Sequence, residues 1–337
     1  MWFERLTGFR EESPEQVRRN LRLEGEWLRS LVNGRRWRCG TLEIPSLAEL
    51  RRRVRELGSA PRGRLTVRQI VGEAGALHRD PANAGALFQV ASQFNLLEMI
   101  NASITPEAGV DRYEKDHTQG PACAIAAGAG TLYRAYFVEV DGGIGQTADR
   151  QIVCLADLGK ALGNENGRLW RMRNGYALAT AEGLREIAHR LANASPEAID
   201  RLRELLRIGI QWNTEVTTSS TGHTVTQAYC SALPIAYGNH ARTAWEPFAR
   251  LVLEAAYEAT LLAGVLNAAK TGNPTVYLTL LGAGAFGNDP TWAAEAMTRA
   301  LRLATDRPLD VRVVAYSKPD TAVTTALAPF IHPSDQG

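Results

Sequence analysis

Long apolar runs are absent from this 337-residue sequence. No segment approaches the roughly twenty uninterrupted apolar residues that a membrane-spanning helix needs. The first residues, MWFERLTGFREE, also lack the apolar stretch of a secretory signal peptide. We therefore expect a protein that does not enter a membrane and is not secreted by that route.

Cysteine and unbalanced charge are equally scarce. The four cysteines lie far apart, with no CxxC pair and no metal-ligand spacing: Cys39, Cys123, Cys154 and Cys230. This pattern is typical of reduced, buried thiols, so we expect a cytoplasmic location and no metal site. The formal net charge is only +2. No overall positive field attracts nucleic acid, and we do not expect a nucleic-acid partner.

The composition that remains is ordinary for a globular protein, with 45% hydrophobic and 22% charged residues. Residues 1–64 carry two helix-start signals, SPEQ at 13–16 and SLAE at 46–49, and roughly helical apolar spacing follows the first as far as Leu31. The arginines at 51–55 fit a solvated helix face or an acidic partner. Strand-like runs begin at Leu65. The sequence therefore predicts a mainly helical N-terminal extension over residues 1–64 and a second domain over residues 65–337.

A strand, a glycine-rich turn and a helix follow one another in residues 276–301. The turn contains three glycines: Gly282, Gly284 and Gly287. Asp289 before Pro290 is a typical helix start. Unpaired N–H groups at such a start, together with the helix dipole, favour a bound phosphate. The spacing also matches the dinucleotide fingerprint, although too few residues follow for the rest of a Rossmann domain.

The stretch from Phe94 to Gly130 is polar and too long to be a simple connection. Four carboxylates occur within ten of its residues: Glu107, Asp111, Glu114 and Asp116. A solvated acidic turn would account for these alone. However, the loop continues into the apolar segment ACAIAAGAG, which indicates that it is held against the core. Carboxylates crowded into one loop can have their pKa values driven apart, giving one acid and one base.

Two distant segments resemble the macrodomain superfamily, in particular its poly(ADP-ribose) glycohydrolase branch. LGAGAFGNDPTWAAEAMTRAL resembles the phosphate-binding strand, turn and helix, and VTQAYCSALPIAYG looks like the AYC-containing stretch that precedes them. ASQFNLLEM resembles the strand that ends in a ribose-contacting asparagine, here Asn95. Gly109-Val110-Asp111 takes the place of the family's glycine-valine-aspartate motif, and Gln119 that of the glycohydrolase glutamine. The resemblance implies an α/β fold, a macrodomain-like mixed sheet flanked by helices.

The resemblance also implies the activity of an ADP-ribosyl hydrolase, which binds ADP-ribose and cleaves the glycosidic bond at the distal ribose. The glycohydrolase branch has two adjacent glutamates after its glutamine, whereas this chain has Gly120 and Pro121. We therefore expect removal of single ADP-ribose units from protein side chains, arginine above all, rather than cleavage of the polymer. The expected partner is ADP-ribose or an ADP-ribosylated protein, and no cofactor is expected.

The resemblance and the acidic loop together suggest the site residues. Asp111 and Asp116 are the expected acid and base, with Glu107 and Glu114 in reserve. The expected substrate-binding residues are Asn95, Gln119, Phe94, Tyr229, Gly282, Ala283, Gly284, Ala285, Phe286 and Gly287.

Two other functions stay open. In a non-catalytic ADP-ribose reader, the acidic residues would only position the ligand. A nicotinamide-dinucleotide-dependent oxidoreductase would use the same glycine turn, and Asp320, after the apolar run at 311–315, lies near where a ribose-binding acid is expected. That third function lacks a recognisable substrate base.

Overall fold

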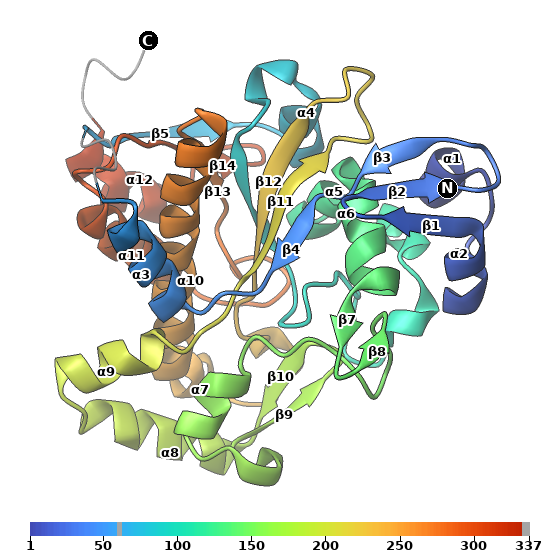
Figure 1. The fold of residues 1–337 in the computed structure, drawn as a ribbon. Helices are drawn as coiled ribbons and strands as arrows, with labels where there is room; N and C mark the ends of the chain where they lie inside the picture. The colour runs from blue at the N-terminus through green and yellow to red at the C-terminus, as the bar shows by residue number, and fades with distance from the viewer. Residues whose placement is uncertain (59–62, 332–337) are drawn as a thin grey trace.

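A seven-stranded mixed sheet forms the centre of the computed structural model, which describes residues 1–58 and 63–331 (Figure 1). The strand order is β4-β11-β12-β6-β13-β14-β5. Strands β12, β6, β13, β14 and β5 are parallel, whereas β11 is antiparallel to both of its neighbours. The bounds are β4 (Thr41–Glu43), β5 (Thr66–Val71), β6 (Leu87–Ala91), β11 (Gly209–Glu215), β12 (Thr224–Cys230), β13 (Thr275–Leu278) and β14 (Asp310–Ala315).

Helices cover both faces of this sheet, as the alternation of side chains along β13 shows. Val276 faces α10 (Arg242–Thr271), and Gly264 lets that helix come close, because a Cβ at Gly264 would lie 2.6 Å from Val276 Cγ2. The next residue, Tyr277, stacks on Phe88 with ring centroids 4.4 Å apart. Phe88 stacks in turn on His78 of α4 (Ala74–Arg79). The expected mixed sheet flanked by helices is confirmed.

The remaining elements are short and surround this centre. The other helices are α1 (Trp2–Thr7), α2 (Pro14–Asn20), α3 (Leu47–Glu56), α5 (Gln119–Ala126), α6 (Gly128–Leu132), α7 (Ala156–Ala161), α8 (Ala181–Ala192), α9 (Pro196–Arg203), α11 (Pro290–Leu303) and α12 (Thr321–Leu327). The small sheets contain β1 (Leu21–Glu24), β2 (Trp27–Ser30), β3 (Arg36–Arg38), β7 (Glu139–Val140), β8 (Gly143–Ile144), β9 (Trp170–Arg173) and β10 (Tyr176–Ala179).

The N-terminal region differs from the expected helical extension. Ser13 caps α2 as its start signal predicts, but the helix ends at Asn20 and the chain reverses at Gly25, whose φ is +63°, to pair β1 with β2. Leu21 and Leu28, which also fit a helical spacing, are buried on this hairpin. Strand β4 is an edge of the main sheet and α3 packs on α10, so the described residues 1–58 contact the region that follows them.

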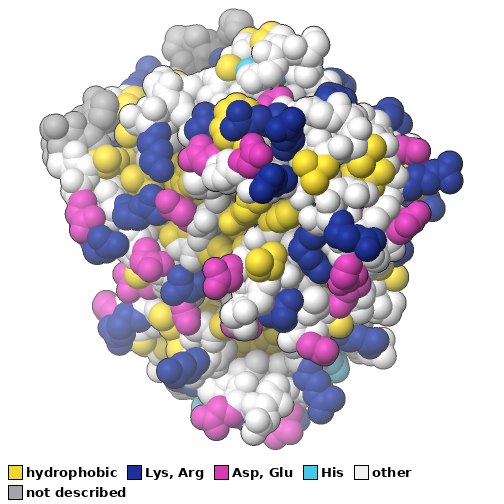
Figure 2. All heavy atoms as spheres, turned by 45° about the vertical axis from the view of Figure 1, so that its right-hand side comes forward, with side chains coloured by type: hydrophobic (Ala, Val, Ile, Leu, Met, Phe, Trp, Pro, Cys, Tyr) yellow, Lys and Arg dark blue, Asp and Glu magenta, His cyan; other side chains and the backbone are white. Residues whose placement is uncertain are grey.

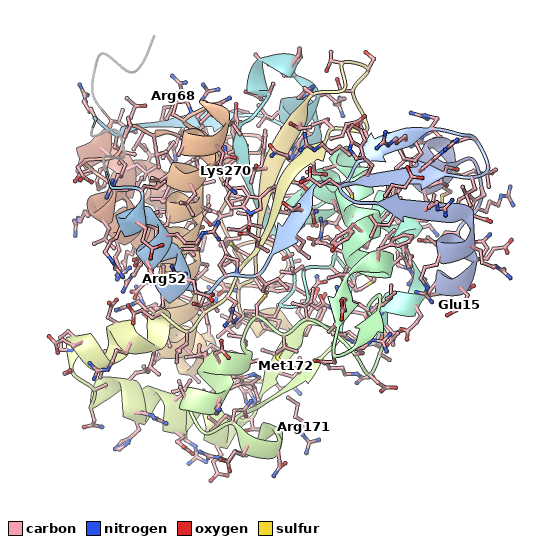
Figure 3. The ribbon with its side chains drawn as sticks, in the orientation of Figure 1. Glu15, Arg52, Arg68, Arg171, Met172 and Lys270 are labelled. Atoms are coloured by element: carbon pink, nitrogen blue, oxygen red, sulfur yellow. The ribbon has the colours of Figure 1, made fainter. Side chains whose placement is uncertain are left out.

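Arginines of helix α3 form ion pairs with carboxylates of the same chain. Arg51 binds Glu258 of α10 at 2.6 Å and Asp200 of α9 at 2.7 Å. Arg52, labelled in Figure 3, pairs with Glu56 one turn further along the helix. Figure 2 shows basic and acidic side chains interspersed over one face of the molecule, which agrees with the net charge of +2. These contacts favour a structural role for the arginines rather than an external acidic partner.

Helix α10 forms the centre of the main core. It is long and apolar enough to cross a membrane, but 83% of its most apolar stretch is buried within the molecule. It packs on β6, β12 and β13 and against α3, α8 and α11. The four cysteines are also buried and unpaired, as the sequence predicts. The apolar character of α10 is therefore that of a core helix.

Candidate active site

A cleft with a volume of about 360 Å³ opens at the C-terminal ends of the parallel strands β5, β6, β13 and β14. Its walls are the segments that follow these strands, together with residues 98–100 and the start of α5. The C-terminal edge of a parallel sheet is where open α/β sheets bind their ligands. Its polar and aromatic lining residues include Glu73, Ser92, Gln93, Glu98, Asp116, His117, Thr118, Gln119, Tyr176, Tyr237, Thr279, Phe286 and Tyr316.

The glycine-rich turn after β13 forms one wall of the cleft. Gly282 and Gly287 have φ values of +74° and +72°, in the left-handed region that glycine adopts without strain. Within the described residues, the backbone N–H groups of residues 284–286 donate no hydrogen bond, and all three residues line the cleft. Asp289 caps α11 itself by accepting from Thr291 N at 2.9 Å. The donors left for an anion are therefore those of the turn, not those of the helix start.

Glu98 is a buried carboxyl group in the wall of the cleft, only 6% exposed. Its Oε1 has no hydrogen-bond partner among residues 1–58 and 63–331. Burial raises the pKa of Glu98 well above its ordinary value, Arg134 opposes this shift, and Asp116 adds to it. Glu98 therefore keeps its proton to a higher pH than an exposed glutamate does.

Asp116 lines the same cleft just before α5 and is half-buried. Its Oδ1 accepts two hydrogen bonds from Thr118, one from the backbone N at 2.9 Å and one from Oγ1 at 2.7 Å. These bonds fix the orientation of the carboxylate. Its Oδ2 accepts none from the part of the chain that the structure describes, and stays available to a ligand.

The first turn of α5 packs directly against Glu98. A Cβ at Gly120 would lie 2.0 Å from Ala91 O and 2.4 Å from Glu98 Oε2, so only glycine permits this approach. Gln119 ties the same turn to β6: its Oε1 accepts from Ala91 N at 2.9 Å and its Nε2 donates to Gln89 O at 2.8 Å. Gln119 thus lines the cleft, but its amide binds the backbone of β6.

Three aromatic rings form a further wall. Phe286 of the glycine-rich turn lies 5.4 Å from Tyr176 and 5.6 Å from Tyr237, measured between ring centroids. The two tyrosines lie 5.0 Å apart, and Tyr176 is held by donating to Met99 O at 2.5 Å. An apolar wall of this kind suits the flat face of a base or a ribose.

Asp111 and Glu114, expected in the site, hold the N-terminal helix instead. Asp111 Oδ1 accepts from Phe3 N at 3.3 Å, and Glu114 Oε2 accepts from Trp2 N at 3.0 Å. Glu114 Oε1 pairs with Arg5 at 2.7 Å. The 3₁₀ turn at Asp111–Lys115 directs these two carboxylates toward α1, away from the cleft. Neither is positioned for the acid or base role that the sequence suggested.

Other expected residues also lie outside the cleft lining. Glu107 is exposed and accepts from a backbone N of the 148–151 turn. Phe94 and Tyr229 belong to the main core. Asn95 is fully buried and donates to Gln151 Oε1 at 2.9 Å, so it shapes the loop rather than facing a ligand. Of the residues predicted from the sequence, the cleft brings together Asp116, Gln119, Gly282, Gly284, Ala285 and Phe286, but neither Ala283 nor Gly287.

Glu98, Tyr176 and Tyr237 line the cleft but were not predicted from the sequence. A glutamate inside the apolar string NLLEMI was a usable signal, because a charged residue among buried neighbours is costly unless it is used. The tyrosines gave no such signal, since they are brought in by distant loops. No group of three or more His, Cys, Asp or Glu side chains in residues 1–58 and 63–331 is arranged to hold a metal ion.

No family model matches this chain, and no curated protein matches it. The fold is similar to solved structures of bacterial poly(ADP-ribose) glycohydrolases, the branch that the sequence motifs resemble. The enzyme from Deinococcus radiodurans in complex with ADP-ribose is 13% identical, with a TM-score of 0.45 over 96% of this chain and 100% of that chain. The enzyme from Thermomonospora curvata is 15% identical, with a TM-score of 0.44 over 94% of this chain and 96% of that chain.

Proposed function

We propose that this protein is an ADP-ribosyl hydrolase, which binds ADP-ribose in the cleft and cleaves the glycosidic bond at the distal ribose. One arrangement carries the proposal. A buried, unpartnered carboxyl group and a half-buried carboxylate, Glu98 and Asp116, line the same cleft as a turn with unpaired N–H groups. Two carboxyl groups suit hydrolysis of a glycosidic bond, and the turn suits a diphosphate.

The ligand is held by the groups that the cleft leaves free. The N–H groups of residues 284–286 donate to the diphosphate, and the absence of a side chain at Gly284, where no atom lies within 4 Å of a Cβ position, leaves room for it. The rings of Phe286, Tyr176 and Tyr237 pack against the adenine or a ribose.

The reaction divides between the two carboxyl groups. Glu98 donates its proton to the leaving atom as the bond from that atom to the ribose carbon breaks, and the bonding electrons depart with the leaving group. The carboxylate of Asp116 stabilises the oxocarbenium-like state and accepts a proton from the water that attacks the ribose carbon. Glu98 then regains a proton from solvent and Asp116 releases to solvent the proton that it accepted, which restores the starting state.

The favoured substrate is a single ADP-ribose unit on a protein side chain, arginine above all. This finer proposal rests on Gly120 and Pro121, which stand where the glycohydrolase branch carries two adjacent glutamates. Gly120 packs on Glu98 and the backbone of β6, and Pro121 is buried, so neither position supplies a carboxyl group to the cleft.

The first test is calorimetric titration with ADP-ribose, with NAD and AMP as comparisons, followed by release of ADP-ribose from modified arginine. Wild-type protein is expected to bind ADP-ribose selectively and to release it. Glu98→Gln and Asp116→Asn should each lower turnover by about a hundredfold while binding persists. The control Asp111→Asn should keep turnover in its folded fraction.

Other results would support other functions. Saturable ADP-ribose binding without release from any modified protein would indicate a reader. Full activity in both Glu98→Gln and Asp116→Asn would contradict the proposed mechanism. Tighter binding of intact NAD would favour the dinucleotide reading of the turn. The structure offers that reading little support, because Asp320 Oδ1 already accepts from Ala322 N and Val323 N at the start of α12.

A further inference from the structure

A buried arginine that is hydrogen-bonded to the segment just before Glu98 has no function in the steps above. Arg134 is 1% exposed and belongs to a π-helical turn, η4 (Tyr133–Phe137). Its guanidinium stacks on the ring of Tyr229 at 3.7 Å from the centroid. Single π-helical turns are rare and occur frequently at functional sites. A cation buried this deeply normally requires a matching negative charge.

Within residues 1–58 and 63–331, the hydrogen bonds of Arg134 go to neutral groups. Its Nε donates to Leu96 O at 3.2 Å, its Nη2 to Thr131 Oγ1 at 3.0 Å and its Nη1 to Gln211 Oε1 at 3.4 Å. No carboxylate of the described residues forms an ion pair with it. The cation is therefore buried with hydrogen bonds but without a direct counter-charge.

Arg134 contacts the backbone segment that carries Glu98. Arg134 is bonded to Leu96 O, two residues before Glu98, and Glu98 N is held by Tyr113 Oη at 2.9 Å. Arg134 lowers the pKa of Glu98, opposing the larger effect of burial. Glu98 is thus a buried carboxyl group that can balance the charge of the arginine, and only when it has lost its proton.

We propose that Arg134 is a positioning residue that fixes the Leu96–Glu98 turn and balances the Glu98 carboxylate that proton transfer leaves behind. Its importance for turnover rests on the proposed function, but the coupling between the two side chains does not. A buried carboxylate without this cation would be strongly disfavoured, and Glu98 would release its proton less readily to the leaving atom.

Other titratable groups also face Glu98. Asp116 raises the pKa of Glu98. Burial raises the pKa values of four further groups that interact electrostatically with Glu98, which keeps them neutral: Tyr113, Tyr176, Tyr229 and Cys123. Arg134 favours the ionised form of Glu98, and these other groups do not. Its removal should therefore move the Glu98 titration in one direction, toward higher pH.

The test compares Arg134→Met, which removes the charge, with Arg134→Lys, which keeps the charge but loses the planar stack and the forked hydrogen bonds. Turnover is measured from pH 5 to pH 9. Activity that needs protonated Glu98 falls as pH rises through the Glu98 pKa. In Arg134→Met this fall should move up by about one pH unit or more, and the maximal rate should drop about tenfold. In Arg134→Lys the fall should stay near its wild-type position.

A second readout needs no catalysis. The raised pKa of Glu98 makes the folded state lose stability as pH rises through the folded pKa, so thermal unfolding against pH reports that pKa. Arg134→Met should extend this loss to higher pH, and the change should vanish in a Glu98→Gln background. If Arg134→Met does not fold, Arg134→Lys is the deciding variant. The proposal predicts that the lysine variant folds and keeps the wild-type titration of Glu98. A merely structural arginine predicts that the lysine variant fails to fold or shows a displaced titration.

The outcomes separate the two proposals. Wild-type pH dependence of both unfolding and turnover in Arg134→Met would overturn the role of Arg134. If Arg134→Met displaces the Glu98 titration but the protein releases no ADP-ribose, the interaction between Arg134 and Glu98 is supported and the proposed hydrolase function is contradicted.

Discussion

At the scale of single residues, the buried carboxyl group of Glu98 costs stability, and its proposed function is to donate a proton. A carboxyl oxygen without a partner in a buried wall opposes folding, because the desolvated group has lost its hydrogen bonds to water. The sign of its pH effect follows from the raised pKa. The stabilising contribution of the protonated form is complete below the ordinary pKa of a glutamate and is lost as pH rises through the folded pKa.

Replacing Glu98 by Gln should therefore stabilise the protein at pH 8 while it lowers turnover about a hundredfold. The expected gain in the free energy of unfolding is about 1–3 kcal/mol, and it should shrink as pH falls toward 5. Urea unfolding at the two pH values measures it. Glu182→Gln, at an exposed position in α8, is the control and should show no comparable gain. A loss of stability at pH 8 in Glu98→Gln would contradict the assignment of an unsatisfied acid.

At the scale of elements, the strand, turn and helix over residues 275–303 depend on two kinds of contact. The start of the helix depends on residues adjacent in the sequence, whereas the turn also depends on a more distant segment. Asp289 and Pro290 begin α11 as predicted, because a cap needs only its own helix. The left-handed turn at Gly282 depends on its neighbours: a Cβ there would lie 2.4 Å from Ala232 Cβ and 2.5 Å from Asn288 Nδ2.

The turn provides a matched pair of variants. Gly282 and Gly272 have φ values of +74° and +77°, but nothing lies within 4 Å of a Cβ at Gly272, which ends α10. Both alanine variants should lose about 1 kcal/mol of stability from backbone strain. Only Gly282→Ala should also displace the turn and weaken ADP-ribose binding, by about tenfold or more in calorimetric titration. Equal affinities for ADP-ribose in the two variants would show that the turn does not contribute to binding.

At the scale of the whole molecule, the N-terminal segment braces the loop that leads to the cleft. Glu11 accepts hydrogen bonds from Val110 N at 3.1 Å, from Asp111 N at 2.7 Å and from Tyr136 Oη. Asp111 and Glu114 hold α1 in return. Residues 1–58 therefore support the candidate site through the 110–116 loop, in addition to contributing β4 to the main sheet.

Loss of this brace should reduce stability more than it changes chemistry. Glu11→Ala leaves two backbone N–H groups and a buried hydroxyl without their acceptor, and should lower the free energy of unfolding by about 1–3 kcal/mol. Turnover of the folded protein should remain within a few-fold of wild type. Glu12→Ala, at the exposed neighbouring position, is the control for thermal unfolding and should be nearly neutral. Similar melting temperatures in the two variants would show that the brace is dispensable.

Sequence by itself determined the features that depend on neighbouring residues. The capping box at Ser46 and Glu49, the start of α11 and the strand runs of β5 and β6 were all predicted, because capping, proline geometry and apolar patterning act within a few residues. The class of fold followed from these elements together with the motif resemblance, and so did the position of the glycine-rich turn.

Tertiary structure alone decided which side chains share the cleft. Four carboxylates close together in the sequence were separated, because a 3₁₀ turn and the N-terminal helix direct Asp111 and Glu114 away from Asp116. Glu98 lines the same cleft as Asp116, and Gly120 lets α5 approach Glu98 closely. The physical reason is that contacts between distant segments fix the direction of each side chain, and proximity along the chain does not encode those contacts.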